Sequence, residues 1–332
     1  MLSAIRTFDI RVETRIVQLQ SIFDTLASAF RIISMAIPAG QLETWSHQGG
    51  TGISTNAYGS VRYALTRASS PLSGRNIEIF LQGSYANATN THGDSDIDVV
   101  VLYEETFYKD MSALTPMQQQ AHERSFGIAT YDWSHLRNDV LAALRTHFGA
   151  PAVTPGNKAI KVTTGAGRMT ADVVPAVQFR RYATFADRNN LTAHWGVHLF
   201  DAAGNGITNY PKYHIERGQD KNGANRTAGR YKSTVRVFKN FRSYMIDRGL
   251  LTREIAPSYF VECAVYNAPD RLFLNPYAES IPAILEFLWT TPFPELISQN
   301  GVVPLIGLGP THWSKEDFTT FLTAARQAWT NF

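Results

Sequence analysis

The chain has 332 residues, of which 44% are hydrophobic and 18% are charged, and its formal net charge is +3. This composition excludes a disordered chain, and so small a net charge argues against wholesale nucleic-acid binding. No apolar run approaches the roughly 20 residues of a membrane span, and the charged N-terminal segment does not resemble a signal peptide. We therefore expect a cytoplasmic protein without a membrane partner, in which the single cysteine, Cys263, is buried.

Helical and strand patterns alternate through the first part of the chain, as hydrophobic periods of about 3.6 and 2 show. The sequence predicts, in chain order, a long helix over 5–33, a helix capped by Ser54, strands at 77–81 and 96–103 around a turn at Gly83-Ser84, a helix over about 134–146, and strands at 158–164 and 169–174.

The second part of the chain changes character. Residues 201–229 are rich in Gly and Asn, which predicts a loop-rich connection between two lobes. Helical patterns then continue to the end, and Ser314 is expected to cap the last of them. These helices are expected at about 230–248, 257–267, 281–290 and 315–330.

Acidic residues open the strand that begins at residue 96. Because side chains alternate along a strand, Asp96 and Asp98 point to one face, about 6–7 Å apart at the backbone. Two carboxylates on one face repel each other unless a cation lies between them, and Mg²⁺ prefers such oxygen ligands. If the strand carrying Asp172 lies beside this one, three carboxylates converge into a two-metal site.

A second set of residues can bind phosphate. Gly83 lets the backbone approach a phosphate closely, and the hydroxyl of Ser84 can hydrogen-bond it. On the helix near 230–248, Lys232, Arg236 and Lys239 share one face and can neutralise a triphosphate. The alternative for this basic stripe is a solvated surface face.

Three histidines lie in the region that precedes the helical half of the chain. His194, His198 and His214 are spaced too irregularly to predict a metal site. A polar surface position or ordinary hydrogen bonding is the expectation for each of them.

In combination, these motifs resemble the nucleotidyltransferase superfamily of the DNA polymerase beta type. More specifically, they resemble the bacterial CD-NTases, the cGAS/DncV-like nucleotidyltransferases of CBASS anti-phage systems. The segments that carry the resemblance are residues 81–90, 94–101, 171–176, 230–239 and 257–262.

The resemblance implies a fold and a set of site residues. The fold is α+β and bilobal: a mixed β-sheet catalytic core with a long N-terminal spine helix at 1–215, and a C-terminal helical lobe at 216–332. Asp96, Asp98 and Asp172 are implied as the catalytic residues and metal ligands. The implied nucleotide-binding residues are Gln82, Gly83, Ser84, Lys232, Arg236, Lys239, Ser258 (on the triphosphate) and Tyr259 (stacked on the donor base).

The resemblance also implies an activity. The enzyme makes a cyclic di- or trinucleotide second messenger from NTPs, with ATP among them, using two Mg²⁺ ions for which Mn²⁺ can substitute. A downstream effector responds to the product rather than to the enzyme, and the lack of a Cys/His zinc module argues against a nucleic-acid activator.

Two other functions remain as alternatives. An RNA-directed nucleotidyltransferase, of the tRNA-tailing or poly(A) type, would need an additional basic RNA-binding domain. A non-catalytic NTP-binding or antitoxin protein is typically expected to have lost a carboxylate, whereas all three acids are present here.

Overall fold

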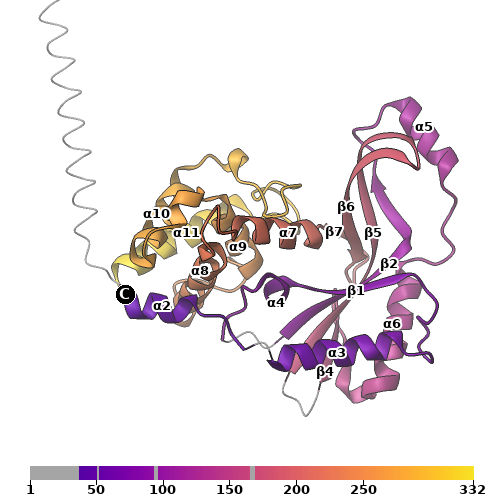
Figure 1. Cartoon of the computed structure of the whole chain (residues 1–332), viewed down its shortest axis with the longest axis horizontal. Helices are drawn as coiled ribbons and strands as arrows, with labels where there is room; N and C mark the ends of the chain where they lie inside the picture. The colour runs from indigo at the N-terminus through magenta and orange to yellow at the C-terminus, as the bar shows by residue number, and fades with distance from the viewer. Residues whose placement is uncertain (1–36, 51, 93–95, 165–168) are drawn as a thin grey trace, which may run out of the picture.

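The computed structural model describes residues 37–332 except 51, 93–95 and 165–168. The long helix predicted over 5–33 lies outside the described residues. Figure 1 shows a β-sheet flanked by helices and, beside it, a separate group of helices that contains most of the C-terminal part of the chain. Within the described part of the chain, none of the helices combines the length and apolar character needed to cross a bilayer.

Among the described residues, the sheet contains seven strands. They are β1 (Ile77–Gln82), β2 (Asp96–Asp110), β3 (Val153–Pro155), β4 (Ile160–Thr164), β5 (Met169–Asp187), β6 (Asn190–Phe200) and β7 (Gly206–Asn209). The α-helices are α2 (Ala39–Ser46), α3 (Gly52–Thr66), α4 (Gly83–Asn87), α5 (Pro116–Ser125), α6 (Trp133–Phe148), α7 (Pro211–Lys221), α8 (Arg230–Asp247), α9 (Ser258–Asn267), α10 (Tyr277–Thr290) and α11 (Lys315–Thr330).

The sheet is mixed, as expected for the α+β fold. Its order is β1-β2-β5-β4-β3, and β6 pairs with β5 and with β7. The β2–β5 pair is parallel, whereas the other pairs are antiparallel. A parallel pair requires a long crossover connection, and here that connection includes α5, α6, β3 and β4. The long strand β5 pairs with β4 near its start and with β6 along its remainder.

Strand alternation in β2 separates an apolar face from an acidic one. Ile97, Val99 and Val101 are fully buried in a core shared with α3 and α6, which cover this face of the sheet (Figure 1). Asp96 and Asp98 point to the opposite face and are half-buried. The predicted division of this strand into two faces is therefore confirmed.

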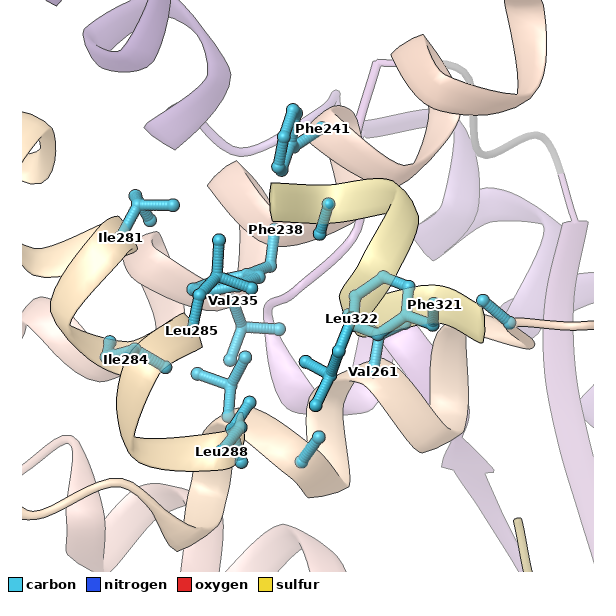
Figure 2. Packing of buried hydrophobic residues seen from close by; sticks show 14 of the residues in the cluster. Val235, Phe238, Phe241, Val261, Ile281, Ile284, Leu285, Leu288, Phe321 and Leu322 are labelled. Atoms are coloured by element: carbon cyan, nitrogen blue, oxygen red, sulfur yellow. The ribbon is translucent and has the colours of Figure 1, made fainter. Parts of the chain in front are cut away.

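The helical group has its own hydrophobic core, formed by α2, α8, α9, α10 and α11 (Figure 2). Val235 and Phe238 of α8, Ile284 of α10 and Phe321 of α11 are almost completely buried in it. Full burial of one such side chain contributes about 1.5–3 kcal/mol, so these helices form a stable body. The helices predicted over the last hundred residues are confirmed, and Ser314 accepts a hydrogen bond from the Asp317 N–H at 3.0 Å as an N-cap.

Several elements differ from the sequence-based expectations. Residues 201–229, predicted to be loop-rich, contain β7 and α7, and Pro211 occupies the first turn of that helix. The helix α5 was not predicted, although Thr115 and Gln118 form a capping box around a proline at its start. The helix α3 begins at Gly52, so Ser54 lies inside its first turn rather than at its N-cap.

Candidate active site

The pairing of β2 with β5 brings the predicted acidic residues together. Asp98 lies directly opposite Asp172, and Asp96 lies opposite Thr170. Paired strands are about 4.8 Å apart, so Asp98 and Asp172 are immediate neighbours across the strands. The predicted adjacency of the two acidic strands is therefore what the structure shows.

A lysine that the sequence analysis missed lies among these acids. Lys161 on β4 is paired with Asp172 in the sheet, and its ammonium donates a hydrogen bond to Asp96 at 3.3 Å. The hydrogen bond and charge of Asp96 raise the pKa of Lys161. The hydroxyl of Thr170 also donates to the Asp96 carboxylate. Lys161 thus supplies positive charge at the acidic face.

Burial and the neighbouring charges shift the pKa of Asp172. Burial raises the pKa of this carboxyl, the nearby charge of Asp96 raises it further, and Lys161 opposes both effects. A carboxylate in this position is stabilised in its charged form by any additional cation. The donor set therefore suits a divalent cation.

Gly83, at the start of α4, closely approaches one of the acids. Its φ of +69° is in the left-handed region that disfavours residues with a side chain. A Cβ atom at this position would lie 2.2 Å from Oδ2 of Asp98. Glycine is therefore needed both for the backbone conformation and for the space that the Asp98 carboxylate occupies.

The acids also make contacts with neighbouring residues. No group of three His, Cys, Asp or Glu side chains within the described residues is arranged to hold a metal ion as it stands. Asp98 lies against Gly83, and Asp96 is bonded to Lys161 and Thr170. The strand register pairs Asp98 with Asp172 and places Asp96 two residues away on the same strand.

The basic stripe of α8 is not a solvated face. Lys239 is only 5% exposed, and its ammonium donates to the Thr89 carbonyl at 2.9 Å. Arg236 is half-buried and donates to the carbonyls of Ser46 and Ala88, both at 2.6 Å. These two cations hold the chain that follows α4, which lies between the sheet and the helical group in Figure 1.

The remaining predicted nucleotide-binding residues lie around α4 and the start of α9. Gln82 ends β1 and immediately precedes α4, which begins with Gly83 and Ser84. Lys232 is half-buried; burial and the charge of Arg236 lower its pKa, whereas Glu262 raises it.

Two further residues of this set begin α9. Ser258 is exposed at the first position of the helix. Tyr259 stacks on His214, with ring centroids 5.3 Å apart and planes at 25°. The chain thus presents a backbone turn on α4, a cation on α8, and a hydroxyl and an aromatic ring at the start of α9.

A buried ion pair near Tyr259 was not predicted. Nε2 of His214 is 3.0 Å from Oε1 of Glu262, and both side chains are about 95% buried. Burial alone lowers the pKa of His214, but its neighbours Cys263 and Glu262 raise it to about 10. Of the two expectations for His214, hydrogen bonding rather than a polar surface position is therefore the one that the structure shows, and Cys263 is buried as expected.

A pocket of about 190 Å³ lies farther along the acidic face. Leu102, one of its lining residues, is four positions beyond Asp98 on β2, or about 13 Å along the strand. Trp195 contributes an exposed aromatic ring to the pocket and Gln178 contributes an amide. The pocket thus lies on the same face of the sheet as Asp98 and combines an exposed aromatic ring with an amide.

Comparisons with known proteins agree with this architecture. The family model for the cGAS/DncV-like nucleotidyltransferase C-terminal helical domain matches residues 216–330, and the model for the nucleotidyltransferase domain matches residues 61–141. The chain is 35% identical over 304 residues to "Cyclic nucleotide synthase CdnE01" of Staphylococcus haemolyticus, covering 89% of this chain and 99% of that protein. It is 36% identical over 298 residues to the "Cyclic UMP-AMP synthase" of Rhodothermus marinus, covering 90% and 99%.

Solved structures show the same relationship. The R. marinus CdnE c-UMP-AMP synthase with Apcpp and Upnpp superimposes with a TM-score of 0.79, at 35% identity, over 89% of this chain and 97% of that one. The Elizabethkingia meningoseptica CdnE cyclic dinucleotide synthase with GTP and Apcpp superimposes with a TM-score of 0.69, at 26% identity, over 88% of this chain and 98% of that one. The chain therefore belongs to the cGAS/DncV-like nucleotidyltransferase family and is a cyclic nucleotide synthase of the CdnE type.

Proposed function

We propose that this enzyme joins two NTPs into a cyclic dinucleotide for anti-phage signalling, and that Asp96, Asp98 and Asp172 are its catalytic carboxylates. The observation that carries this proposal is the direct pairing of Asp98 with Asp172, both half-buried, in neighbouring parallel strands. The candidate phosphate loop is Gly83-Ser84, at the start of α4. Its first residue, Gly83, lies against the carboxylate of Asp98. Acids and phosphate-binding backbone are thereby within reach of one triphosphate.

The proposed cofactor is a pair of Mg²⁺ ions, for which Mn²⁺ can substitute. Nucleotidyltransferases typically depend on metal, and carboxylate oxygens are the ligands that Mg²⁺ prefers. When bound, Mg²⁺ would activate the attacking hydroxyl and stabilise the charge of the leaving pyrophosphate. Asp96, Asp98 and Asp172 are the proposed ligands, the first two after leaving their contacts with Lys161 and Gly83, and Asp172 is proposed to position the ion that would activate the acceptor hydroxyl.

The donor NTP is proposed to lie between α4 and the helical group. Ser84 and the exposed Ser258 would donate hydrogen bonds to its triphosphate, Lys232 would supply charge, and Tyr259 would stack on its base. Gln82 would contact the nucleotide from the end of β1.

Two residues of the basic stripe have a different proposed role. Arg236 and Lys239 hold the carbonyls behind the phosphate loop, so their support for donor binding is proposed to pass through that backbone.

The second NTP is proposed to place its base in the pocket lined by Gln178 and Trp195. An indole ring stacks on any base, whereas an amide can bond to particular base edges. The R. marinus relative is named for a UMP-AMP product and the E. meningoseptica relative for dipurine products. ATP is therefore proposed as one substrate, and the other base is left open.

Further proposals concern the wider setting. The sheet part and the helical part are proposed to divide near residues 215 and 216, giving domains of 1–215 and 216–332, although α2 packs into the helical core. The enzyme is proposed to act in the cytoplasm, where NTPs are made, and to reach its effector only through its product, without a nucleic-acid activator. No particular observation favours an RNA-directed transferase or a non-catalytic protein.

The test uses purified protein, labelled NTPs and Mg²⁺, without RNA, followed by phosphatase treatment. Wild type should yield a small phosphatase-resistant product, and the double variant Asp96→Ala/Asp98→Ala should stay folded and yield none. Asp110→Ala is the matched control, because Asp110 is an acid at the far end of the same strand. Near wild-type turnover by the double variant would show that these acids are not the catalytic ones.

A further inference from the structure

The residues that follow α4, 88–90, form a turn that we call the Thr89 turn. Thr89 is fully buried, and its N–H donates to the Ser84 carbonyl at 2.9 Å. The position of this turn therefore sets the position of the candidate phosphate loop. Ala88 has a φ of 54°, a left-handed conformation that a residue with a side chain keeps only where its surroundings hold it. The hydrogen bond from Arg236 to its carbonyl is one such restraint.

A buried carboxylate from the helical group holds the same turn. Oε2 of Glu262, on α9, accepts a hydrogen bond from the Thr89 hydroxyl at 2.8 Å. Its other oxygen, Oε1, is 3.0 Å from Nε2 of His214 on α7. Placing charges in so dry a position is unfavourable unless each is paired, and the charge of Lys239 adds to that pairing. Glu262 thus joins α7, α8 and α9 to the Thr89 turn.

The chain of contacts continues to the proposed donor-base contact. Tyr259 is three residues before Glu262 on α9 and stacks on His214, the ion-pair partner of Glu262. A base that presses on Tyr259 would therefore act on His214 and, through Glu262 and Thr89, on the loop at Ser84. No exposed side chain interrupts the part of this path from His214 to Thr89.

We propose that Glu262 is a positioning residue that couples the donor-base contact at Tyr259 to the phosphate loop at Ser84, by way of His214 and Thr89. This inference rests on the donor-binding roles proposed above for Tyr259 and Ser84. It makes base stacking in the helical group and phosphate binding next to the sheet interdependent. A network that only stabilised the junction would leave the two independent.

The test compares Thr89→Val, which removes the hydroxyl at nearly constant volume, with Thr89→Ser, which keeps it. Each full-length variant is titrated with a non-hydrolysable ATP analogue and Mg²⁺, and KM and kcat are measured beside the Tm. Thr89→Val should weaken analogue binding by about tenfold, the effect of one hydrogen bond to a charged group, and should raise KM. Thr89→Ser should bind within about twofold of wild type, as expected if the hydroxyl is the essential group.

Coupling is measured by adding Tyr259→Ala to Thr89→Val in a double-mutant cycle. The loss of analogue affinity caused by Thr89→Val should be several-fold smaller in the Tyr259→Ala background than in wild type. If Thr89→Val is too unstable to assay, Glu262→Gln replaces it in the cycle, since it keeps the side-chain size but removes the charge and replaces one acceptor oxygen by an NH2 donor. The loss of analogue affinity caused by Glu262→Gln should likewise be smaller in the Tyr259→Ala background than in wild type.

Three results would overturn the proposal. A folded Thr89→Val variant could bind the analogue as tightly as wild type, or Thr89→Ser could lose as much affinity as Thr89→Val. The third result is that the losses of affinity from Thr89→Val and Tyr259→Ala simply add in the cycle. Each of these concerns the coupling alone, provided that wild type makes the phosphatase-resistant product. Failure of the proposed function would be recognised separately, by turnover that persists in Asp96→Ala/Asp98→Ala.

Discussion

Replacing Gly83 by alanine tests how closely the phosphate loop and the acidic face fit together. The added Cβ would lie 2.2 Å from Oδ2 of Asp98, whereas ordinary contacts begin near 3.4 Å. The carboxylate or the loop must therefore retreat by about 1.2 Å. A misplacement of about 1 Å at a catalytic group can cost about a hundredfold in rate. The left-handed backbone at Gly83 adds a stability cost of about 1–2 kcal/mol for a residue with a side chain.

We therefore expect Gly83→Ala to lose about a hundredfold in kcat while it stays folded. The assay is product formation from labelled NTPs with Mg²⁺, with thermal unfolding of the same preparation to measure stability. Gly74→Ala is the matched control: its φ is +80°, but nothing lies within 4 Å of the added Cβ. It should show a similar loss of stability and wild-type kcat.

Two outcomes would refute this reasoning. If Gly83→Ala turned over within about twofold of wild type, a range far below the loss expected from such a displacement, the contact with Asp98 would not matter for catalysis. If Gly74→Ala lost as much kcat as Gly83→Ala, backbone strain alone would explain both results.

Three further predictions follow from the site. Asp172→Ala should reduce kcat far more than it weakens binding of a non-hydrolysable NTP, as parallel turnover and titration would show; equal losses would mean that Asp172 binds the donor. Activity should require Mg²⁺ or Mn²⁺ and stop in EDTA, while Ca²⁺ should support analogue binding with little turnover because its longer coordination misplaces the reacting atoms. The stabilisation from protonated His214 should be complete below pH 6.5 and lost as pH rises through about 10, because its folded pKa is raised. The Tm of wild type should accordingly fall more over that pH range than the Tm of His214→Gln. Parallel curves of Tm against pH for the two proteins would contradict the raised pKa of His214.

Local patterns in the sequence predicted much of the fold. The four long C-terminal helices follow from 3.6-residue periodicity, and the division of β2 into an acidic and an apolar face follows from alternation alone. The capping box at Thr115 shows that α5 could also have been found, because its signal spans only four residues. The strand β6 and the far half of β5 are harder, because their many polar residues weaken the alternating pattern.

Some features of the candidate site could also be predicted from the sequence, and others could not. The residue types of the acids and of the Gly-Ser loop indicated nucleotide chemistry, since the need for oxygen ligands and a close backbone approach belongs to the residues themselves. The role of the basic stripe was not predictable, because the burial of Lys239 depends on the Thr89 turn, which is 150 residues away in the chain.

The sequence by itself therefore determined many of the helices and strands, which face of β2 carries Asp96 and Asp98, and which chemistry those acids suit. Only the tertiary structure decided that Asp98 meets Asp172, that Lys161 lies among the acids, and that His214 and Glu262, 48 residues apart, form a buried pair. The physical reason is how far apart in the chain the residues that determine each feature lie. Side-chain alternation is a property of a few consecutive residues, whereas strand register and buried ion pairs depend on segments that approach each other only when the whole chain packs.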